Sequence, residues 1–425
     1  MMSQEPLSLR TRVIILVVAF LGWFFGGIQI GITNLVMLPA AEDLIQKAEL
    51  AAGLSEKEIA DTIMSWYAYF QCAFLFGAAA GGYFFGRLGD RIGRTRALGV
   101  SVIWFSIFTG ASYLAQTPSQ LLLLRFIACL GVGGCWPNGV ALVSEVWAKV
   151  ARPVMASLIG MAGNLGIFTI ATLGKHYEVT PESWRWVLLI GASPILLGLI
   201  ALFLVKESPS WTAAQGKNSG SSSQKTEEIS VFRRPYLGIT IIGIALATVP
   251  LFGGWGSANW IIPWAAEIGP PELKAEILQV RSVTSIIGSA LAGVIATLVG
   301  RRLTYFFTSL GALLTAQYVF WFTTPLDSEF LALVGLLGFF NGLFFGWLPF
   351  FLPELFESRV RATGAGVSFN FGRILTATTI FLTPAMTQAF GGSYAQIGRT
   401  TSLIFAIGMV VVLLAPDTSK RKLDA

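Results

Sequence analysis

The chain is dominated by long apolar runs that short charged segments separate. A transmembrane helix needs about 20 mostly apolar residues, and the 425-residue sequence contains twelve runs of this kind. Only 12% of the residues are charged, against roughly 25% in ordinary soluble proteins. We therefore predict an all-α membrane protein with twelve transmembrane helices. The predicted spans are 13–39, 62–86, 97–115, 119–143, 153–174, 184–205, 236–264, 275–299, 302–323, 329–352, 362–384 and 399–416.

One long polar segment divides the predicted spans six and six. Residues 206–235 contain GKNSGSSSQKTEE, a composition that is typical of a flexible linker. Most of the other connections are short. We therefore predict an N-terminal six-helix half over 1–205, a cytoplasmic linker over 206–235, and a C-terminal six-helix half over 236–425.

The distribution of Lys and Arg predicts how the chain is oriented, because cytoplasmic loops are enriched in these residues. If the N-terminus is cytoplasmic, twenty of the 29 Lys and Arg residues lie in inner segments, six lie in outer loops and three lie inside spans. We therefore expect a multi-pass protein with both termini in the cytoplasm. Short loops favour the bacterial inner (plasma) membrane as its location.

The residue content argues against several other classes of function. The chain has one histidine, His176, and its three cysteines (Cys72, Cys129 and Cys135) lie in apolar stretches without metal-site spacing. Acid, base or metal residues suited to an enzyme are missing from the spans, and no phosphate-binding loop suggests an ATP-driven pump. The basic residues form no nucleic-acid-binding stripe. We expect no metal or cofactor, and a monomer whose partners are membrane lipids and a small molecule.

A charged motif follows the second predicted span, where residues 86–98 read GRLGDRIGRTRAL. Glycines allow two helix ends to approach, and a carboxylate can accept hydrogen bonds from arginine or from a helix N-terminus. The motif resembles the signature loop of the major facilitator superfamily, which implies a latch that holds the cytoplasmic side closed. The alternative is a loop that only anchors the topology by its positive charge. The predicted latch residues are Gly86, Asp90, Arg91, Gly93 and Arg94.

Two further patterns are similar to the same superfamily. The fourth span contains RFIACLGVGG from Arg125 onward, close to the Arg-x-x-x-Gly-x-Gly motif of that family. Glu145 and Arg152 follow this span seven residues apart, and Glu354 and Arg361 repeat the spacing after the tenth span. The repeat implies two related halves, and we include these four residues in the predicted gate. The loop after the eighth span keeps only Gly-Arg-Arg without an aspartate, so an aspartate-based latch is expected in one half only.

Other segments resemble particular branches of the superfamily. KESPSW at 206–211 is similar to an element of sugar porters and metabolite:proton symporters, whereas Trp-Pro-Asn at 136–138 looks closer to acid-carrying symporters. Those acid symporters usually carry an aspartate in the first helix, and the stretch 21–34 has none. Two energy sources are then considered. Either protons couple through Asp61 or Glu145, or the substrate moves down its own gradient.

Three arginines lie inside predicted spans, whereas no carboxylate lies near the centre of one. A charged side chain in lipid is costly and is a functional candidate. Arg373 follows Arg361 by twelve residues, or about 18 Å of helix. Because the guanidinium fork matches a carboxylate, we predict that Arg373 and Asn370 bind an anionic group and that Arg281 assists. Arg125 is a further candidate. The alternative is that these arginines bond backbone carbonyls or extend to the interface.

Amide and indole side chains complete the predicted substrate site. They are Gln29 in the first span, Asn164 in the fifth, and Trp255 with Asn259 in the seventh, where Pro and Gly residues interrupt the helix. Interrupted helices often form binding sites in transporters. The resulting prediction is a secondary transporter of a small organic anion, a carboxylate, that works by alternating access. The alternative is a sugar or other neutral-metabolite porter.

Overall fold

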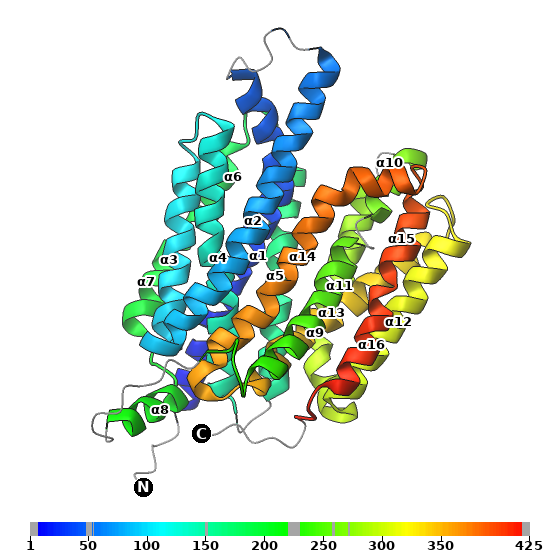
Figure 1. The fold of residues 1–425 in the computed structure, drawn as a ribbon. Coiled ribbons are helices and arrows are strands. Elements are labelled where there is room, and N and C mark those ends of the chain that lie inside the picture. The colour runs from blue at the N-terminus through cyan, green and yellow to red at the C-terminus, as the bar shows by residue number, and fades with distance from the viewer. Residues whose placement is uncertain are drawn as a thin grey trace.

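Long, roughly aligned helices make up most of the protein in a computed structural model (Figure 1). The structure describes residues 7–47, 53, 55–148, 152–219, 230–256, 260–270 and 273–418. In Figure 1 the N-terminal helices stand on the left, in blue to cyan-green, and the C-terminal helices stand on the right. The N-terminal group comprises α1 (Leu9–Lys47), α2 (Glu56–Ile92), α3 (Arg94–Ser112), α4 (Pro118–Val146), α5 (Arg152–His176), α6 (Arg185–Ala192) and α7 (Ile195–Leu204).

The C-terminal group repeats this pattern of long helices. The segment that joins the groups begins with a helix, α8 (Pro209–Ser219), although its composition suggested a flexible linker throughout. Two of the predicted spans are each made of two consecutive helices in this group, as α6 and α7 are in the first. The group comprises α9 (Leu237–Gly256), α10 (Ile261–Ile268), α11 (Leu273–Val299), α12 (Arg301–Phe322), α13 (Phe330–Leu355), the 3-10 helix η2 (Ser358–Val360), α14 (Arg361–Ala389), α15 (Tyr394–Ser402) and α16 (Ile404–Leu414).

Helices are present at all twelve predicted spans. Within the described residues, ten helical stretches are long and apolar enough to cross a membrane. The two others, α3 and α14, contain too many polar residues for that criterion. In α14 the polar residues from Arg361 to Asn370 are buried in the bundle, where protein groups rather than lipid surround them. Polar residues are tolerated in a membrane helix in this position.

Glycines allow α2 and α4 to touch backbone to backbone. A Cβ atom on Gly81 of α2 would lie 1.9 Å from the carbonyl oxygen of Leu130 in α4. In return, a Cβ atom on Gly133 of α4 would lie 2.0 Å from the carbonyl oxygen of Ala78 in α2. Real Cβ atoms do not approach backbone this closely, so both positions require glycine.

The C-terminal half contains the same reciprocal pair of contacts. A Cβ atom on Gly288 of α11 would lie 2.2 Å from the carbonyl oxygen of Phe339, and one on Gly342 of α13 would lie 2.1 Å from that of Ser285. The glycines of α2 and α11 are 207 residues apart, and those of α4 and α13 are 209 residues apart. The internal repeat therefore extends to single helix–helix contacts.

The two halves meet through a second matched pair of glycines. Gly86 of α2 faces α14, where its Cβ atom would lie 2.8 Å from the carbonyl oxygen of Ala362. Gly293 of α11 faces α5, where its Cβ atom would lie 2.4 Å from the carbonyl oxygen of Pro153. Figure 1 shows α14 beside α2 at the junction. Gly86 of the predicted latch thus permits the close crossing between halves.

The glycine contacts predict opposite effects for two alanine substitutions. Gly133→Ala forces a Cβ atom against backbone, so we expect it to cost about 1–3 kcal/mol through overpacking. Gly238→Ala, in α9, meets no heavy atom within 4 Å, and alanine in an open helical position gains about 0.5–1 kcal/mol. Thermal unfolding in detergent should show a lower midpoint for Gly133→Ala and an unchanged or higher one for Gly238→Ala. Equal midpoints would contradict the packing argument.

Candidate functional site

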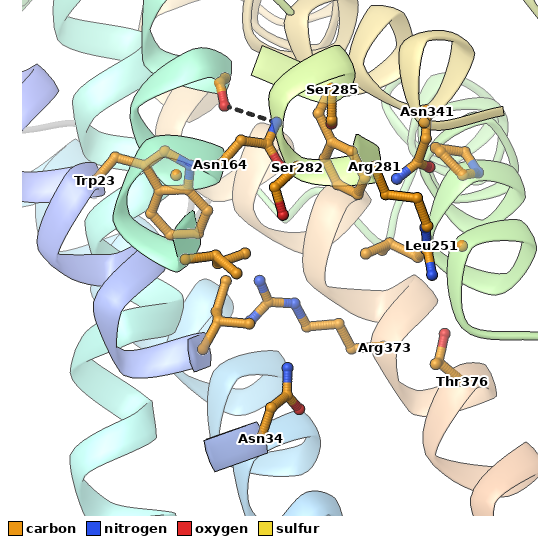
Figure 2. Close-up of a pocket in the computed structure, with 18 of the residues that line it drawn as sticks. Trp23, Asn34, Asn164, Leu251, Arg281, Ser282, Ser285, Asn341, Arg373 and Thr376 are labelled. Carbon is orange, nitrogen blue, oxygen red and sulfur yellow. Dashed lines mark hydrogen bonds between the residues drawn. The ribbon is translucent and has the colours of Figure 1, made fainter. Parts of the chain in front are cut away.

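A cavity of about 230 Å³ lies between the halves, which is smaller than the ~300–1,000 Å³ pockets of drug-sized ligands. Helices α1, α2 and α5 line it from the N-terminal half, and α9, α11, α13 and α14 line it from the C-terminal half. Its walls combine aromatic rings with polar groups (Figure 2). The aromatic lining is Trp23, Phe74, Phe345 and Phe369; the polar lining is Asn34, Asn164, Arg281, Ser282, Ser285, Asn341, Arg373 and Thr376.

Arg373 presents its guanidinium to this cavity from α14. The residue is only 3% exposed, and its Cζ atom lies 5.1 Å from the ring of Phe74 and 5.3 Å from the ring of Phe369. Its Nη1 atom has no hydrogen-bond partner among the described residues. Figure 2 shows the side chain pointing into the space below Asn164 and Ser282. Aromatic faces attract a cation but do not neutralise it, so the guanidinium can still bind an anion.

Two other predicted binding residues also line the cavity. Arg281 reaches it from α11, and Figure 2 shows its side chain extending toward Leu251. Asn164 of α5 donates a hydrogen bond from Nδ2 to the hydroxyl of Ser289 in α11, at 3.0 Å, and so joins the two halves. Asn164 follows Arg152 by the twelve residues that separate Arg373 from Arg361. Asn164 is thus the counterpart of Arg373 in the repeat.

Three predicted binding residues lie outside the cavity lining and join helices instead. Arg125 donates to Gln29 Oε1 and to the hydroxyl of Thr33, both at 3.1 Å. Gln29 in turn donates to a backbone carbonyl of α6. Asn370 donates to the carbonyl of Gly133 in α4 at 3.3 Å and to one within α14. These contacts give all three side chains a packing role.

The predicted interruption of the seventh span falls on residues 257–259, which lie outside the described residues. Helix α9 ends at Gly256 and α10 begins at Ile261, and Pro250 and Gly254 of α9 line the cavity. Asn259 lies outside the described residues, and so does the side chain of Trp255.

An aromatic cluster forms part of the cavity wall. The ring of Phe369 stacks on that of Trp136 at a centroid distance of 4.0 Å, and Trp23 and Phe345 approach Phe369 edge-on at 6.4 Å. The cluster joins α1 and α4 of one half to α13 and α14 of the other. Along α14, Phe369 lies between Arg373 and Arg361, about 12 Å of helix from Arg361.

Beyond this cluster, Asp90 of α2 binds the first turn of α14. Its carboxylate accepts backbone N–H groups from Ala362 at 3.2 Å and Thr363 at 2.8 Å, as well as the hydroxyl of Thr363. It also pairs with Arg94 at 2.8 Å. A carboxylate at a helix N-terminus satisfies unpaired N–H groups and the positive end of the helix dipole. The N-terminal half thus caps a helix of the C-terminal half.

Buried Glu145 at the end of α4 connects the halves in a second way. Its Oε1 atom lies 3.2 Å from a nitrogen of Arg94 and 2.8 Å from a nitrogen of Arg361, which belongs to α14. Its Oε2 atom accepts the hydroxyl of Ser208, which precedes α8. Arg94 also donates to the carbonyl of Ser358 in η2. One carboxylate therefore binds both halves and the connecting segment.

Glu354 at the end of α13 forms the matching arrangement. Its Oε1 atom lies 2.6 Å from a nitrogen of Arg152 in α5 and 3.4 Å from one of Arg301 in α12, and Oε2 accepts the hydroxyl of Thr418. The position that corresponds to Asp90 is Thr297, whose hydroxyl bonds within α11. The capping aspartate is therefore present in one half only. We call this region, defined by Asp90, Arg94, Arg152, Glu145, Glu354 and Arg361, the charged end.

The remaining residues of the predicted latch differ in their surroundings. Gly93 has φ +109°, and a Cβ atom there would lie 2.1 Å from an oxygen of Glu207. Glu207 accepts the backbone N–H of Arg94 at 3.0 Å and that of Thr95 at 3.1 Å, so it caps α3. Arg91 is exposed.

Several of these residues were not among the predicted site residues. KESPSW was recognised as a family element, but nothing in it indicated that Glu207 and Ser208 bind the charged end. The aromatic residues Trp23, Phe74 and Phe369 gave no signal, because an aromatic side chain in a predicted span resembles any other lipid-facing or core residue.

Comparisons with known proteins agree with this architecture. The cis,cis-muconate transport protein of Acinetobacter baylyi is 28% identical over 307 residues, covering 71% of this chain and 73% of that protein. The putative niacin/nicotinamide transporter of Bacillus subtilis is 28% identical over 415 residues, covering 97% and 95%. The structure of the proton:xylose symporter XylE bound to 6-bromo-6-deoxy-D-glucose matches with a TM-score of 0.74 at 17% identity, covering 97% and 98%; this shows the fold alone.

The sequence profile described as Major Facilitator Superfamily matches residues 13–377, which is most of the chain. The helices, the repeat and the central cavity agree with that match. The protein is therefore a member of the Major Facilitator Superfamily, a multi-pass secondary transporter of small metabolites and not an enzyme.

Proposed function

We propose that this transporter carries a small organic carboxylate through its central cavity by alternating access. The observation that carries the proposal is the buried guanidinium of Arg373, a residue of the cavity lining whose Nη1 atom has no hydrogen-bond partner in the described part of the chain. A buried charge without a counter-charge is costly. A carboxylate substrate can neutralise it through two parallel hydrogen bonds.

The rest of the lining suits a small organic acid. Among the described residues that line the cavity there is no carboxylate, so no acidic side chain there competes for Arg373. Arg281 adds a second positive group, and Phe74 and Phe369 offer apolar faces to the hydrocarbon part. The names of two relatives include muconate and niacin, which are carboxylates, although the second name also includes the neutral nicotinamide.

We further propose that the charged end faces the cytoplasm, as the bias of Lys and Arg predicts. Opening that side then requires α14 to leave the Asp90 cap, and Arg361 and Arg152 to leave the glutamates of the opposite half. Hydrogen bonds that involve charged groups contribute about 1.5–3 kcal/mol each. The latch is thus strong enough to set which side of the cavity is open.

Ligand-induced stabilisation tests the anion site. The panel contains cis,cis-muconate, nicotinate, nicotinamide and xylose; nicotinate and nicotinamide share a ring and differ in the carboxylate. A ligand at 100 times its dissociation constant stabilises by about 2.7 kcal/mol. We expect the carboxylates to raise the unfolding midpoint, nicotinamide and xylose to have little effect, and Arg373→Gln to abolish the shift.

Arg125→Gln is the matched control, because it removes a buried arginine whose two terminal nitrogens already donate to Gln29 and Thr33. It should lower the midpoint without ligand, since it deprives Gln29 and Thr33 of their partner, but it should keep the ligand-induced shift. Arg373→Gln should leave the ligand-free midpoint unchanged or higher. Stabilisation of both variants by xylose or nicotinamide, with no effect of carboxylates, would instead favour the neutral-metabolite porter.

Cysteine labelling tests the latch. Val360 is 4% exposed in η2, which packs against α2 and α8, so Val360→Cys reports opening of the charged end. We expect Asp90→Asn to speed its labelling by a hydrophilic thiol reagent several-fold, because the cap on α14 is weakened. The buried native cysteines provide the background rate, measured without Val360→Cys.

Asp43→Asn is the control for the labelling experiment. Asp43 pairs with Arg185 at 2.8 Å, as Asp90 does with Arg94, and both of these pairs lie within the N-terminal half. Asp90 in addition accepts N–H groups from α14 of the other half, and the control substitution leaves that contact intact. This substitution should lower stability without changing the labelling of Val360→Cys. Equal labelling rates in Asp90→Asn and the unaltered protein would exclude Asp90 as a latch.

A further inference from the structure

We infer that this carrier exchanges one anion for another across the membrane and does not return empty, because the described residues that line the cavity offer the Arg373 charge no carboxylate partner. The inference rests on the proposed carboxylate site. It concerns a separate property, namely whether binding of a second anion is required for the return step.

The positive charge of the cavity belongs entirely to the C-terminal half. Arg373 lies on α14 and Arg281 on α11, and both line the cavity. The N-terminal half contributes the neutral polar groups of Trp23, Asn34 and Asn164. Asn164, the counterpart of Arg373, already bonds Ser289. The described residues that the N-terminal half contributes to the lining therefore include no counter-charge.

Within the described part of the chain, the carboxylates of Asp90, Glu145 and Glu354 belong to the charged end and not to the cavity lining. Around Arg373, α2 presents Phe74, α14 presents Phe369, and α1 and α5 present amides. The carboxylates of Asp90 and Glu145 lie at the charged end and form ion pairs with arginine there. The stretch 21–34 of α1 contains no acid.

This charge arrangement slows the step in which the empty carrier changes the side on which its cavity is open. Changing the open side requires an intermediate that is closed at both ends, in which the cavity has lost most of its water. A guanidinium left without water or anion there is unfavourable, whereas a bound carboxylate pairs with it and lowers the barrier. A carrier with a titratable carboxylate beside the arginine could form an internal ion pair and return empty; the lining described here has none.

Reconstituted liposomes test the inference directly. They are loaded with labelled cis,cis-muconate or nicotinate, whichever stabilises the protein more, and diluted into buffer with or without the same unlabelled anion. Valinomycin and equal potassium on both sides prevent the membrane potential from limiting net flux. We expect efflux to be at least about tenfold faster with external anion, which corresponds to about 1.4 kcal/mol in the barrier. An imposed pH gradient should drive no net uptake.

A second readout does not depend on transport. In the absence of any anion, Arg373→Gln removes the charge that holds back the empty carrier, so labelling of Val360→Cys at the charged end should become faster. Arg125→Gln, which removes a charge outside the cavity, should leave that rate unchanged. Equal labelling in Arg373→Gln and the parent would contradict a charge-based block.

The outcomes separate the two proposals. Rapid efflux into anion-free buffer, or net uptake driven by a pH gradient, would overturn obligatory exchange while leaving the carboxylate transporter intact. If neither anion moves in an Arg373-dependent way under any of these conditions, the proposed function fails, and the exchange inference fails with it.

Discussion

Two buried glutamates determine how the halves fit together. Glu145 binds an arginine of its own half and Arg361 of the other, and Glu354 does the same with Arg152. A buried carboxylate that loses one partner leaves an uncompensated charge, which costs several kcal/mol. The ion pairs of Glu145 and Glu354 across the junction therefore favour two arrangements of the halves. In one, both glutamates are paired across the junction, and in the other both are solvated; an arrangement with a buried glutamate that has lost its partner is disfavoured. The close glycine contacts between α2 and α14 depend on the first arrangement.

The sequence predicted the fold well because each half repeats local rules. Apolar length located the spans, and the spacing of seven between glutamate and arginine identified matching helix ends. Boundaries were less accurate where tertiary contacts extend a helix. Helix α1 continues past Pro39 to Lys47, since Asp43 binds Trp184 and Arg185 there. No local signal in the sequence indicates that long-range contact.

The site was harder to predict because binding depends on which way each helix faces. The twelve-residue distance from Arg361 placed Arg373 at cavity depth. Asn370 is only three residues earlier, but at 3.6 residues per turn it points about 60° away, and its amide bonds α4 instead of the cavity. Arg125 and Gln29 were predicted as separate binding residues, but Arg125 donates a hydrogen bond to Gln29. Pairings of this kind depend on packing between helices that are distant in sequence.

Helix α14 connects the proposed latch to the proposed substrate site. Its first turn is capped by Asp90, Phe369 stacks on Trp136, and Arg373 enters the cavity about 18 Å from Arg361. A helix moves largely as one body, so a rotation that withdraws its first turn from Asp90 also shifts Phe369 and changes the distance between Arg373 and the N-terminal half. A bound anion that joins Arg373 to that half would therefore act on the same element as the latch. Through α14, binding of a charged substrate at Arg373 would therefore alter the contact between α14 and Asp90 at the charged end.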